Sequence, residues 1–222
     1  MDGRTRIDLS HDVEAGMVTY PGLPGPVISD HLSREASRER YAAGTEFQIG
    51  RIEMVANTGT YVDSAFHRYP DGSDLAALPL ERLADLDGVV VDVTDATGRA
   101  IDATAFRPYD LTGRAVLIHT GWDRHWRTEA YVQGHPYLSA EAAQHIVDAG
   151  AALVGIDSLN IDDAPGDGSR PVHSILLAAG IPICEHLTNL GGLPADGFRF
   201  SAVPVKVRGM GTFPVRAYAV FG

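Results

Sequence analysis

Hydrophobic and polar positions along the chain follow two different spacings. Short runs that alternate or are continuously apolar predict strands at residues 7–9, 46–57, 89–93, 115–118, 152–156, 181–185, 198–207 and 213–220. Apolar residues with helical spacing predict helices at 75–86, 139–148 and 171–179. Ser139 and Gly150 stand where the second helix needs an N-cap and a stop. The last two strands are expected to form a terminal hairpin.

The order of these segments indicates the fold class. Strands and helices interleave in the middle of the chain, and alternating strands stand at both ends. This order predicts an α/β protein with a central mixed β-sheet flanked by helices, rather than a purely parallel doubly wound sheet. No segment has the composition of a linker, so residues 1–222 are expected to form one domain. Residues 20–26, rich in proline and glycine, are expected to form a rigid loop.

The composition is that of a globular protein. Of the 222 residues, 45% are hydrophobic and 21% are charged, which excludes a disordered or collagen-like chain. The longest nearly apolar run, residues 175–184, is shorter than the roughly 20 residues that span a bilayer, and the charged start does not resemble a signal peptide. We therefore expect a cytoplasmic protein with no membrane partner. The single cysteine, Cys184, excludes an intrachain disulfide and is expected to lie in the core.

The charge balance and the missing motifs exclude further function classes. A net charge of −11 disfavours nucleic acid as a partner. Lys206 is the only lysine, and no motif around it supports Schiff-base chemistry. The Walker A, GxSxG, CxxC and HExxH motifs are all absent. The common classes of nucleotide-cofactor and nucleophilic enzymes are therefore unsupported.

Carboxylates and histidines gather after three predicted strands. Asp63 and His67 lie four residues apart after one strand. His173 and Glu185 bracket an apolar segment that would return both to one edge of the sheet, and a third acidic group lies at 155–163. Such groups suit zinc or manganese, although spacing alone also allows helix caps and buried structural histidines. The histidines remote from these carboxylates are expected to be surface or structural groups: His119, His125, His135 and His145.

At these clusters the chain resembles the cyclase family of metal-dependent hydrolases, whose better-known members are bacterial kynurenine formamidase and isatin hydrolase. The family signature is His-x-Gly-Thr-His-x-Asp-x-Pro-x-His, and residues 57–67 read Asn-Thr-Gly-Thr-Tyr-Val-Asp-Ser-Ala-Phe-His in the same register. The resemblance covers nearly the whole chain. Further landmarks are Asp8-Leu9-Ser10, Tyr20-Pro21-Gly22, Thr120-Gly121-Trp122, Gly155-Ile156-Asp157, Asn189-Leu190 and Pro214-Val215-Arg216.

The resemblance implies a fold, an assembly and a reaction. It implies an α/β fold around a mixed sheet, and a homodimer or larger assembly with the active site near the subunit boundary. The implied reaction is hydrolysis of an amide or lactam C–N bond by metal-activated water. Carried over residue by residue, Asp63, His173 and Glu185 fall on metal ligands, and His67 falls on the catalytic acid/base.

The chain departs from the family signature at three positions. Asn57 and Tyr61 stand where the family has histidines, and Ala65 replaces the proline. A neutral imidazole is a strong ligand, whereas an amide oxygen is weak and a phenol, with a pKa of about 10, must first lose a proton. We therefore expect one divalent ion, Zn²⁺ or Mn²⁺, rather than two, held by three ligands with one open position.

Three functions follow from these residues. The first is a hydrolase of a small metabolite in which His67 moves the proton. The second is a metal-poor cyclase, dehydratase or isomerase that uses His67, with Tyr61 as a donor to a developing oxyanion. The third is a non-catalytic small-molecule binding protein on the same scaffold. Substrate contacts are assigned to Asn57, Tyr20 and Trp122.

Overall fold

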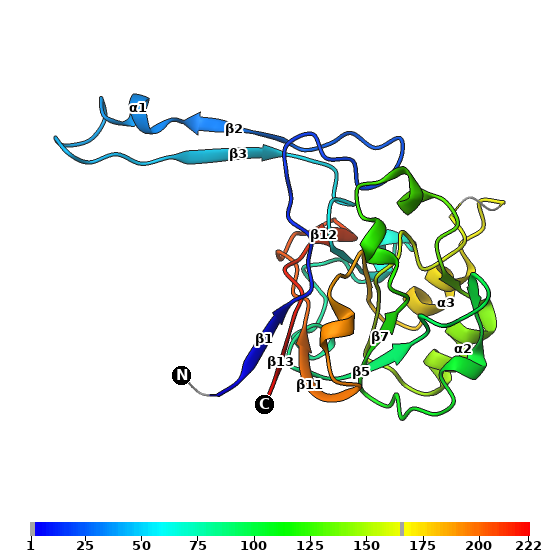
Figure 1. Ribbon diagram of the computed structural model, residues 1–222. Helices are drawn as coiled ribbons and strands as arrows, with labels where there is room; N and C mark the ends of the chain where they lie inside the picture. Colours follow the sequence, from blue (N-terminus) through cyan, green and yellow to red (C-terminus); the bar gives the residue numbers. More distant parts are fainter. Residues whose placement is uncertain (1–2, 165–166) are drawn as a thin grey trace.

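A curled nine-stranded sheet forms the centre of the molecule. The computed structural model describes residues 3–164 and 167–222 (Figure 1). In spatial order the strands of the main sheet are β1 (Thr5–Asp8), β13 (Tyr218–Phe221), β11 (Asp196–Ser201), β5 (Leu86–Asp92), β7 (Ala115–His119), β9 (Leu153–Ile156), β10 (Ile183–Glu185), β4 (Tyr61–Asp63) and β12 (Thr212–Pro214). The order is strongly non-sequential, so residues far apart in the chain become neighbours.

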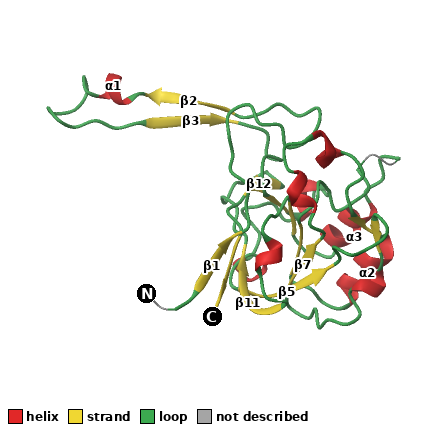
Figure 2. Ribbon diagram, in the orientation of Figure 1, coloured by secondary structure: helices red, strands yellow, loops and turns green. Residues whose placement is uncertain are grey.

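The sheet is mixed, as the sequence predicts. The central strands β5, β7, β9 and β10 run parallel, and the strands outside them pair antiparallel. Helices α2 (Ala140–Asp148) and α3 (Pro171–Ala178) pack together on one face (Figure 2). Alternate residues of the central strands enter different cores: Val89 and Val91 pack towards the helices, whereas Val90 packs on the opposite face. The α/β prediction is therefore confirmed.

Both longer helices begin and end where the sequence predicts. The Ser139 side chain accepts a hydrogen bond from Ala142 N and caps α2, and Gly150, at φ +75°, follows the end of the helix. Pro171 opens α3 at its first turn, where a missing N–H costs nothing. The two helices cover the sheet beside the strands that carry the acidic and histidine clusters.

One sequence prediction is wrong, and another is confirmed only in part. The helix expected at 75–86 is only a 3₁₀ turn at Leu80–Arg82, because Pro79 lacks a backbone N–H and disfavours helical geometry in the residue before it. The two segments of the expected terminal hairpin do pair antiparallel, as β11 and β13, but β12 lies between them in the chain and pairs with β4 instead. This departure of β12 brings Thr212 opposite Asp63.

A two-stranded arm projects from the body (Figure 1). It consists of β2 (Val27–Leu32), the short helix α1 (Arg34–Ser37) and β3 (Ile49–Glu53), which is the central part of the strand predicted at 46–57. Leu32 of the arm is buried, but five other apolar side chains expose 48–59% of their surface: Val27, Ile28, Phe47, Ile49 and Ile52. Of these, Phe47 contacts the Tyr41 ring edge-on, with ring centroids 5.1 Å apart.

The remaining regular segments are short. Strands β6 (Ala100–Ile101) and β8 (Tyr137–Leu138) form a small parallel pair. The 3₁₀ turns other than that at Leu80–Arg82 are Ala65–His67, Ala103–Ala105, Trp122–His125, Glu129–Val132 and Leu190–Gly192. Within residues 3–164 and 167–222, every helix is too short or too polar to be a membrane span.

Candidate active site

Strands β4 and β10 and helix α3 bring the two predicted clusters together. Tyr61 and Asp63 alternate along β4 and share one side of it, and the antiparallel register places Tyr61 opposite Glu185 of β10. Gly59, at φ +64°, makes the turn into β4, a conformation that a side chain would strain. His67 follows in the 3₁₀ turn after β4, and His173 lies in the first turn of α3.

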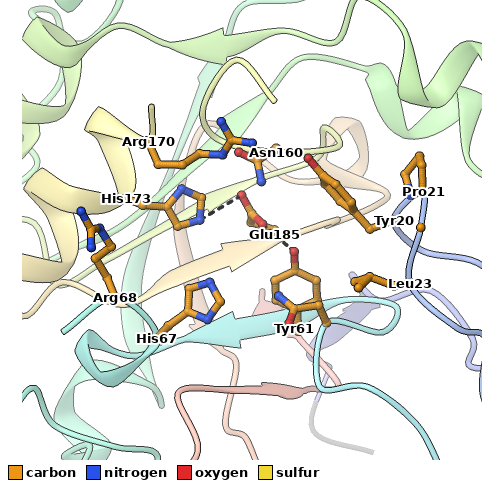
Figure 3. Close-up of a pocket in the computed structure, with 12 residues that line it drawn as sticks. Tyr20, Pro21, Leu23, Tyr61, His67, Arg68, Asn160, Arg170, His173 and Glu185 are labelled. Carbon is orange, nitrogen blue, oxygen red and sulfur yellow. Dashed lines mark hydrogen bonds and ion pairs between the residues drawn. The ribbon is translucent and has the colours of Figure 1, made fainter. Parts of the chain in front are cut away.

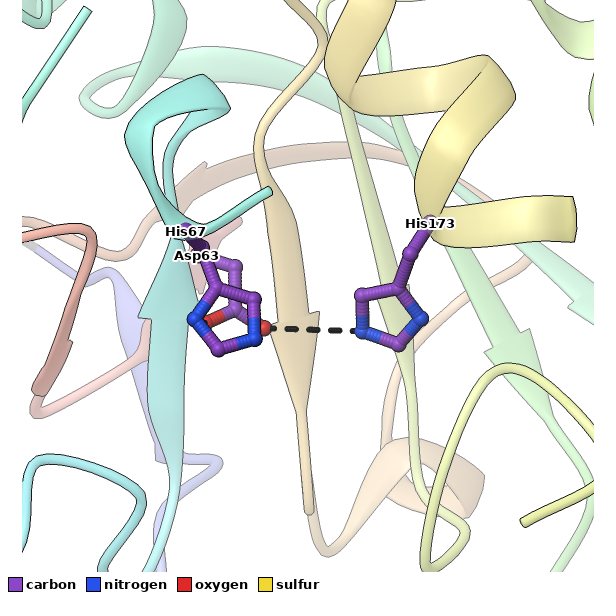
Figure 4. A group of neighbouring side chains, drawn as sticks. All are labelled: Asp63, His67 and His173. Atoms are coloured by element: carbon purple, nitrogen blue, oxygen red, sulfur yellow. Dashed lines mark ion pairs between the residues drawn. The ribbon is translucent and has the colours of Figure 1, made fainter. Parts of the chain in front are cut away.

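The acidic and imidazole groups converge on one point. Asp63 Oδ2 lies 3.7 Å from His173 Nε2, and Glu185 Oε1 lies 3.7 Å from the same nitrogen. His67 completes a group with Asp63 and His173 whose ligand atoms lie within 4.8 Å of one another (Figure 4). Asp63 Oδ2 is buried and has no hydrogen-bond partner among the described residues. An unsatisfied buried carboxylate oxygen facing an imidazole nitrogen fits a metal ion.

Asp162 fixes the ring of His173. Its Oδ2 lies 2.6 Å from His173 Nδ1, and its two oxygens also accept hydrogen bonds from the Val172 and His173 backbone N–H groups. The carboxylate therefore caps α3 and leaves His173 Nε2 facing the cluster, an arrangement typical of metal-ligating histidines. Burial opposes a charge on His173, but Glu185, Asp162 and Asp63 outweigh burial and raise the pKa of His173 to about 10.

Thr212 links Asp63 to His67. Its hydroxyl donates to Asp63 Oδ1 and lies 2.8 Å from His67 Nδ1. Because the single hydroxyl proton is given to the carboxylate, the oxygen accepts from Nδ1–H of His67. His67 therefore presents Nε2 as its unprotonated nitrogen when the ring is neutral.

Tyr61 stands where the family signature has a histidine, and in this structure its side chain is a hydrogen-bond donor. Its hydroxyl donates to Glu185 Oε2 at 2.7 Å, and Glu185 Oε1 accepts from Ile161 N at 2.7 Å. Complete burial, with Glu185 and Asp63 nearby, raises the pKa of Tyr61 well above its usual value, and Asn57 opposes that rise only in part. The phenol stays protonated and does not supply an anionic ligand.

Of the groups described above, Tyr61, His67, His173 and Glu185 line a cavity of about 480 Å³ (Figure 3). Two of the three predicted substrate contacts, Tyr20 and Asn57, line it. Trp122 is not among the lining residues: its Nε1 donates to Tyr131 O and its ring packs against His125. The complete lining is Tyr20, Pro21, Gly22, Leu23, Asn57, Tyr61, His67, Arg68, Asn160, Arg170, His173 and Glu185.

Sequence reasoning missed Asp162, Thr212 and both arginines of the cavity. Asp162 had a signal, since it belongs to the acidic group at 155–163. Thr212 had none, because only the pairing of β12 with β4 places it beside Asp63.

Three polar groups outside the cavity are structural. Cys184 is fully buried, and burial raises the pKa of its thiol, in agreement with the predicted core role. His135 is buried and its Nε2 contacts Asp162 O at 3.0 Å. Asp157 accepts hydrogen bonds from Thr120 and Gly121 backbone N–H groups, so these two landmark segments hold each other in place.

Known proteins share both the sequence and the fold of this chain. The Cyclase family model matches residues 7–163. The kynurenine formamidases of Bacillus cereus and Salinibacter ruber are 25% and 27% identical, each over 95% of both chains. Among solved structures, a potential metal-dependent hydrolase with cyclase activity aligns with a TM-score of 0.80 at 24% identity over 99% of both chains. Isatin hydrolase A from Labrenzia aggregata, bound to benzyl benzoate, aligns with a TM-score of 0.81 at 20% identity, covering 98% of this chain and 94% of that one. The chain belongs to the Cyclase family.

Proposed function

We propose that this protein is a metal-dependent hydrolase that cleaves an amide or lactam C–N bond of a small metabolite. The observation that carries the proposal is the convergence of Asp63, His173 and Glu185 at the wall of a cavity that His173 and Glu185 line and that is large enough for a small substrate. The relatedness to kynurenine formamidases supports this reaction class. Hydrolysis adds water to the carbonyl carbon, breaks the C–N bond and returns a proton to the nitrogen.

Asp63, His173 and Glu185 would hold one zinc or manganese ion. Two buried carboxylate oxygens face one imidazole nitrogen, an arrangement of ligand atoms that suits a divalent ion, and Asp63 Oδ2 has no hydrogen-bond partner in the described residues. When bound, such an ion supplies Lewis-acid polarisation of a carbonyl or of water. Asn57 and Tyr61 do not supply ligands for a second metal ion, because the Tyr61 phenol is protonated and donates its hydrogen bond to Glu185.

His67 would move the proton during hydrolysis. Thr212 accepts from its Nδ1–H and leaves Nε2 free as a proton acceptor in the cavity. The same imidazole would return the proton to the leaving nitrogen. In the metal-poor alternative, the Tyr61 phenol on the cavity wall would have to exchange its hydrogen bond to Glu185 before it could donate to an oxygen that gains negative charge.

A second candidate is acid–base catalysis of cyclisation, dehydration or isomerisation without a metal. The Thr212–His67 contact favours it, because His67 keeps its tautomer through protein groups alone. The third candidate, a binding protein, requires only the cavity.

Metal content and turnover distinguish these candidates. Purified protein is loaded with Zn²⁺ or Mn²⁺, desalted, analysed for metal, and assayed with formanilide and isatin. We expect about one ion per chain and turnover that disappears in chelator and returns with metal. His173→Ala should lose both, whereas the matched change His145→Ala, on α2, should lose neither. Hydrolysis by a metal-free sample would overturn the metal requirement, and a protein that hydrolyses neither compound would count against the proposed hydrolase.

The exposed arm would join two copies of this chain. On one side of the arm Ile28 and Ile52 are directly paired across β2 and β3, and both are half exposed. An isolated two-stranded ribbon with such a face is marginal in water, so a partner surface is expected to cover it. The proposed partner is a second copy, in line with the assembly that the family resemblance implies.

A further inference from the structure

Two arginines line the cavity beside the proposed catalytic groups. Figure 3 shows Arg68 and Arg170 on either side of His173, with Tyr20, Pro21 and Leu23 across the cavity. The protein carries a net charge of −11, whereas this cavity is lined by two positively charged guanidinium groups.

Both guanidinium groups are held by neutral oxygen atoms. Arg68 Nε donates to Ser174 Oγ at 3.4 Å, and Ser174 Oγ donates in turn to the Arg170 backbone carbonyl. Arg170 donates to Ser169 O and Ala164 O. The Arg68 guanidinium also lies over the Tyr69 ring, with Cζ 5.5 Å from its centroid. These contacts position the two groups and leave both without a carboxylate at hydrogen-bond distance.

Neither arginine forms an ion pair within residues 3–164 and 167–222. Other arginines of the chain do so: Arg99 pairs with Asp163, and Arg216 pairs with Asp8. Asp167, an exposed carboxylate, acts on Arg170 only at longer range. An anion entering the cavity therefore meets two available guanidinium groups.

We infer that Arg68 and Arg170 form a carboxylate-binding subsite, and that the substrate is a small amide or lactam that carries a carboxylate near its scissile carbonyl. A planar guanidinium binds a carboxylate through two parallel hydrogen bonds, and its charge strengthens both. The apolar part of the substrate then lies towards Tyr20 and Leu23. This inference rests on the proposed hydrolysis for its substrate, but the subsite itself is testable without turnover.

Two matched pairs of small molecules test the subsite. 2-Formamidobenzoate and formanilide are aryl formamides with and without the carboxylate, and anthranilate and aniline are the corresponding products. For the parent protein kcat/KM should be at least ~10-fold higher for 2-formamidobenzoate, and anthranilate should bind ~10-fold more tightly than aniline.

Arginine variants decide the inference. Arg68→Gln, Arg170→Gln and the double change should each reduce the preference for 2-formamidobenzoate over formanilide and the binding of anthranilate by ~10-fold or more. Lysine at either position should restore part of the preference. Arg107→Gln, at an exposed position outside the cavity, is the control.

The possible failures are distinguishable. Unchanged anthranilate binding in the folded double variant would overturn the subsite, whatever the enzyme hydrolyses. If the parent turns over neither formamide but binds anthranilate through both arginines, the subsite stands and the proposed hydrolysis fails. If Arg170→Gln does not fold, the test uses Arg68→Gln, at an exposed position, and the lysine variants instead.

Discussion

Asp162 Oδ2 and His173 Nδ1 lie 2.6 Å apart in the buried first turn of α3. The contact joins a helix cap to an imidazole, because the same carboxylate also accepts the Val172 and His173 backbone N–H groups. The position of His173 Nε2 thus depends on a residue that does not itself face Asp63 or Glu185. The carboxylate that caps α3 therefore also orients the imidazole of the proposed metal site.

Asp162→Asn should weaken metal binding by about 10–100-fold, because an amide nitrogen cannot accept the hydrogen bonds that the second carboxylate oxygen accepts. Competition with a chelating dye would give the Zn²⁺ dissociation constant of each variant. Asp95→Asn, at an exposed position, should bind Zn²⁺ like the parent. Unchanged affinity in folded Asp162→Asn would mean that Asp162 does not position a metal ligand.

Thr212→Val should lower kcat by about tenfold with little change in KM, because His67 loses the group that fixes its tautomer while the cavity wall keeps its shape. Thr212→Ser retains the hydroxyl and should retain most activity. Steady-state kinetics over a range of pH would check both variants. Equal rates for the valine and serine variants would show that His67 does not depend on Thr212 for proton transfer.

The sequence predicts the site where its residues are close in the chain. Asp63 and His67 share one short segment, and His173 and Glu185 bracket one helix and one strand, so their approach follows from local structure and the parallel sheet. Thr212 reaches Asp63 from 149 residues away through a strand pairing that no local pattern encodes. Hydrophobic periodicity identifies strands but does not choose their partners.

Periodicity also marks an apolar face without saying what covers it. The alternation at 46–57 predicts a strand, yet β3 packs on no core and lies in the exposed arm. The leucine spacing at 75–86 predicts a helix, but Pro79 removes a backbone donor and the segment packs as turns instead. In both segments tertiary context decides what the pattern leaves open.

The free energy of unfolding should fall as the pH falls below about 6.5, partly because of His11. Burial lowers the pKa of His11 to about 4, against the opposing effects of Asp123 and Asp12. The unfolded chain therefore binds a proton that the folded chain does not, so the stabilisation is complete above pH 6.5 and is lost progressively towards pH 4. After allowance for solvent screening, His11 contributes about 1 kcal/mol of the loss at pH 5.

Urea unfolding at pH 7 and pH 5 would measure this effect. His11→Phe keeps a ring stacked on Trp126, whose centroid lies 3.9 Å from that of His11, and removes the titrating group. Its stability should therefore change less between the two pH values than that of the parent. An identical pH dependence would assign the acid sensitivity to other groups.

The arm allows a test of assembly that leaves the body unchanged. Ile28→Lys with Ile52→Glu replaces an apolar cross-strand pair by opposite charges, which preserves the hairpin but removes its apolar face. The parent should elute as a dimer or larger, and the double variant as a monomer. The control is the double variant Ser29→Lys with Arg51→Glu, which introduces the same two charges at the neighbouring cross-strand pair on the other face of the arm. This control should elute like the parent. A parent that is monomeric at micromolar concentration would contradict the proposed dimer.

Replacing Asn57 and Tyr61 together by histidine should create a second metal site that shares Asp63. Tyr61 lies opposite Glu185 and two residues before Asp63 on the same side of β4, so an imidazole there would face the same carboxylates. The change also removes the Tyr61–Glu185 hydrogen bond at 2.7 Å, which should destabilise the apo variant by about 1–3 kcal/mol.

Metal analysis after desalting should therefore find about one more ion per chain in the double variant than in the parent. Added Zn²⁺ should raise its melting temperature more than that of the parent, because binding to the folded state stabilises it. Tyr61→Phe is the matched control, since it loses the same hydrogen bond without gaining a ligand. If the double variant folds but holds no more metal than Tyr61→Phe, residues 57–67 share the register of the family signature without its metal geometry, and metal-free acid–base catalysis by His67 becomes the stronger candidate.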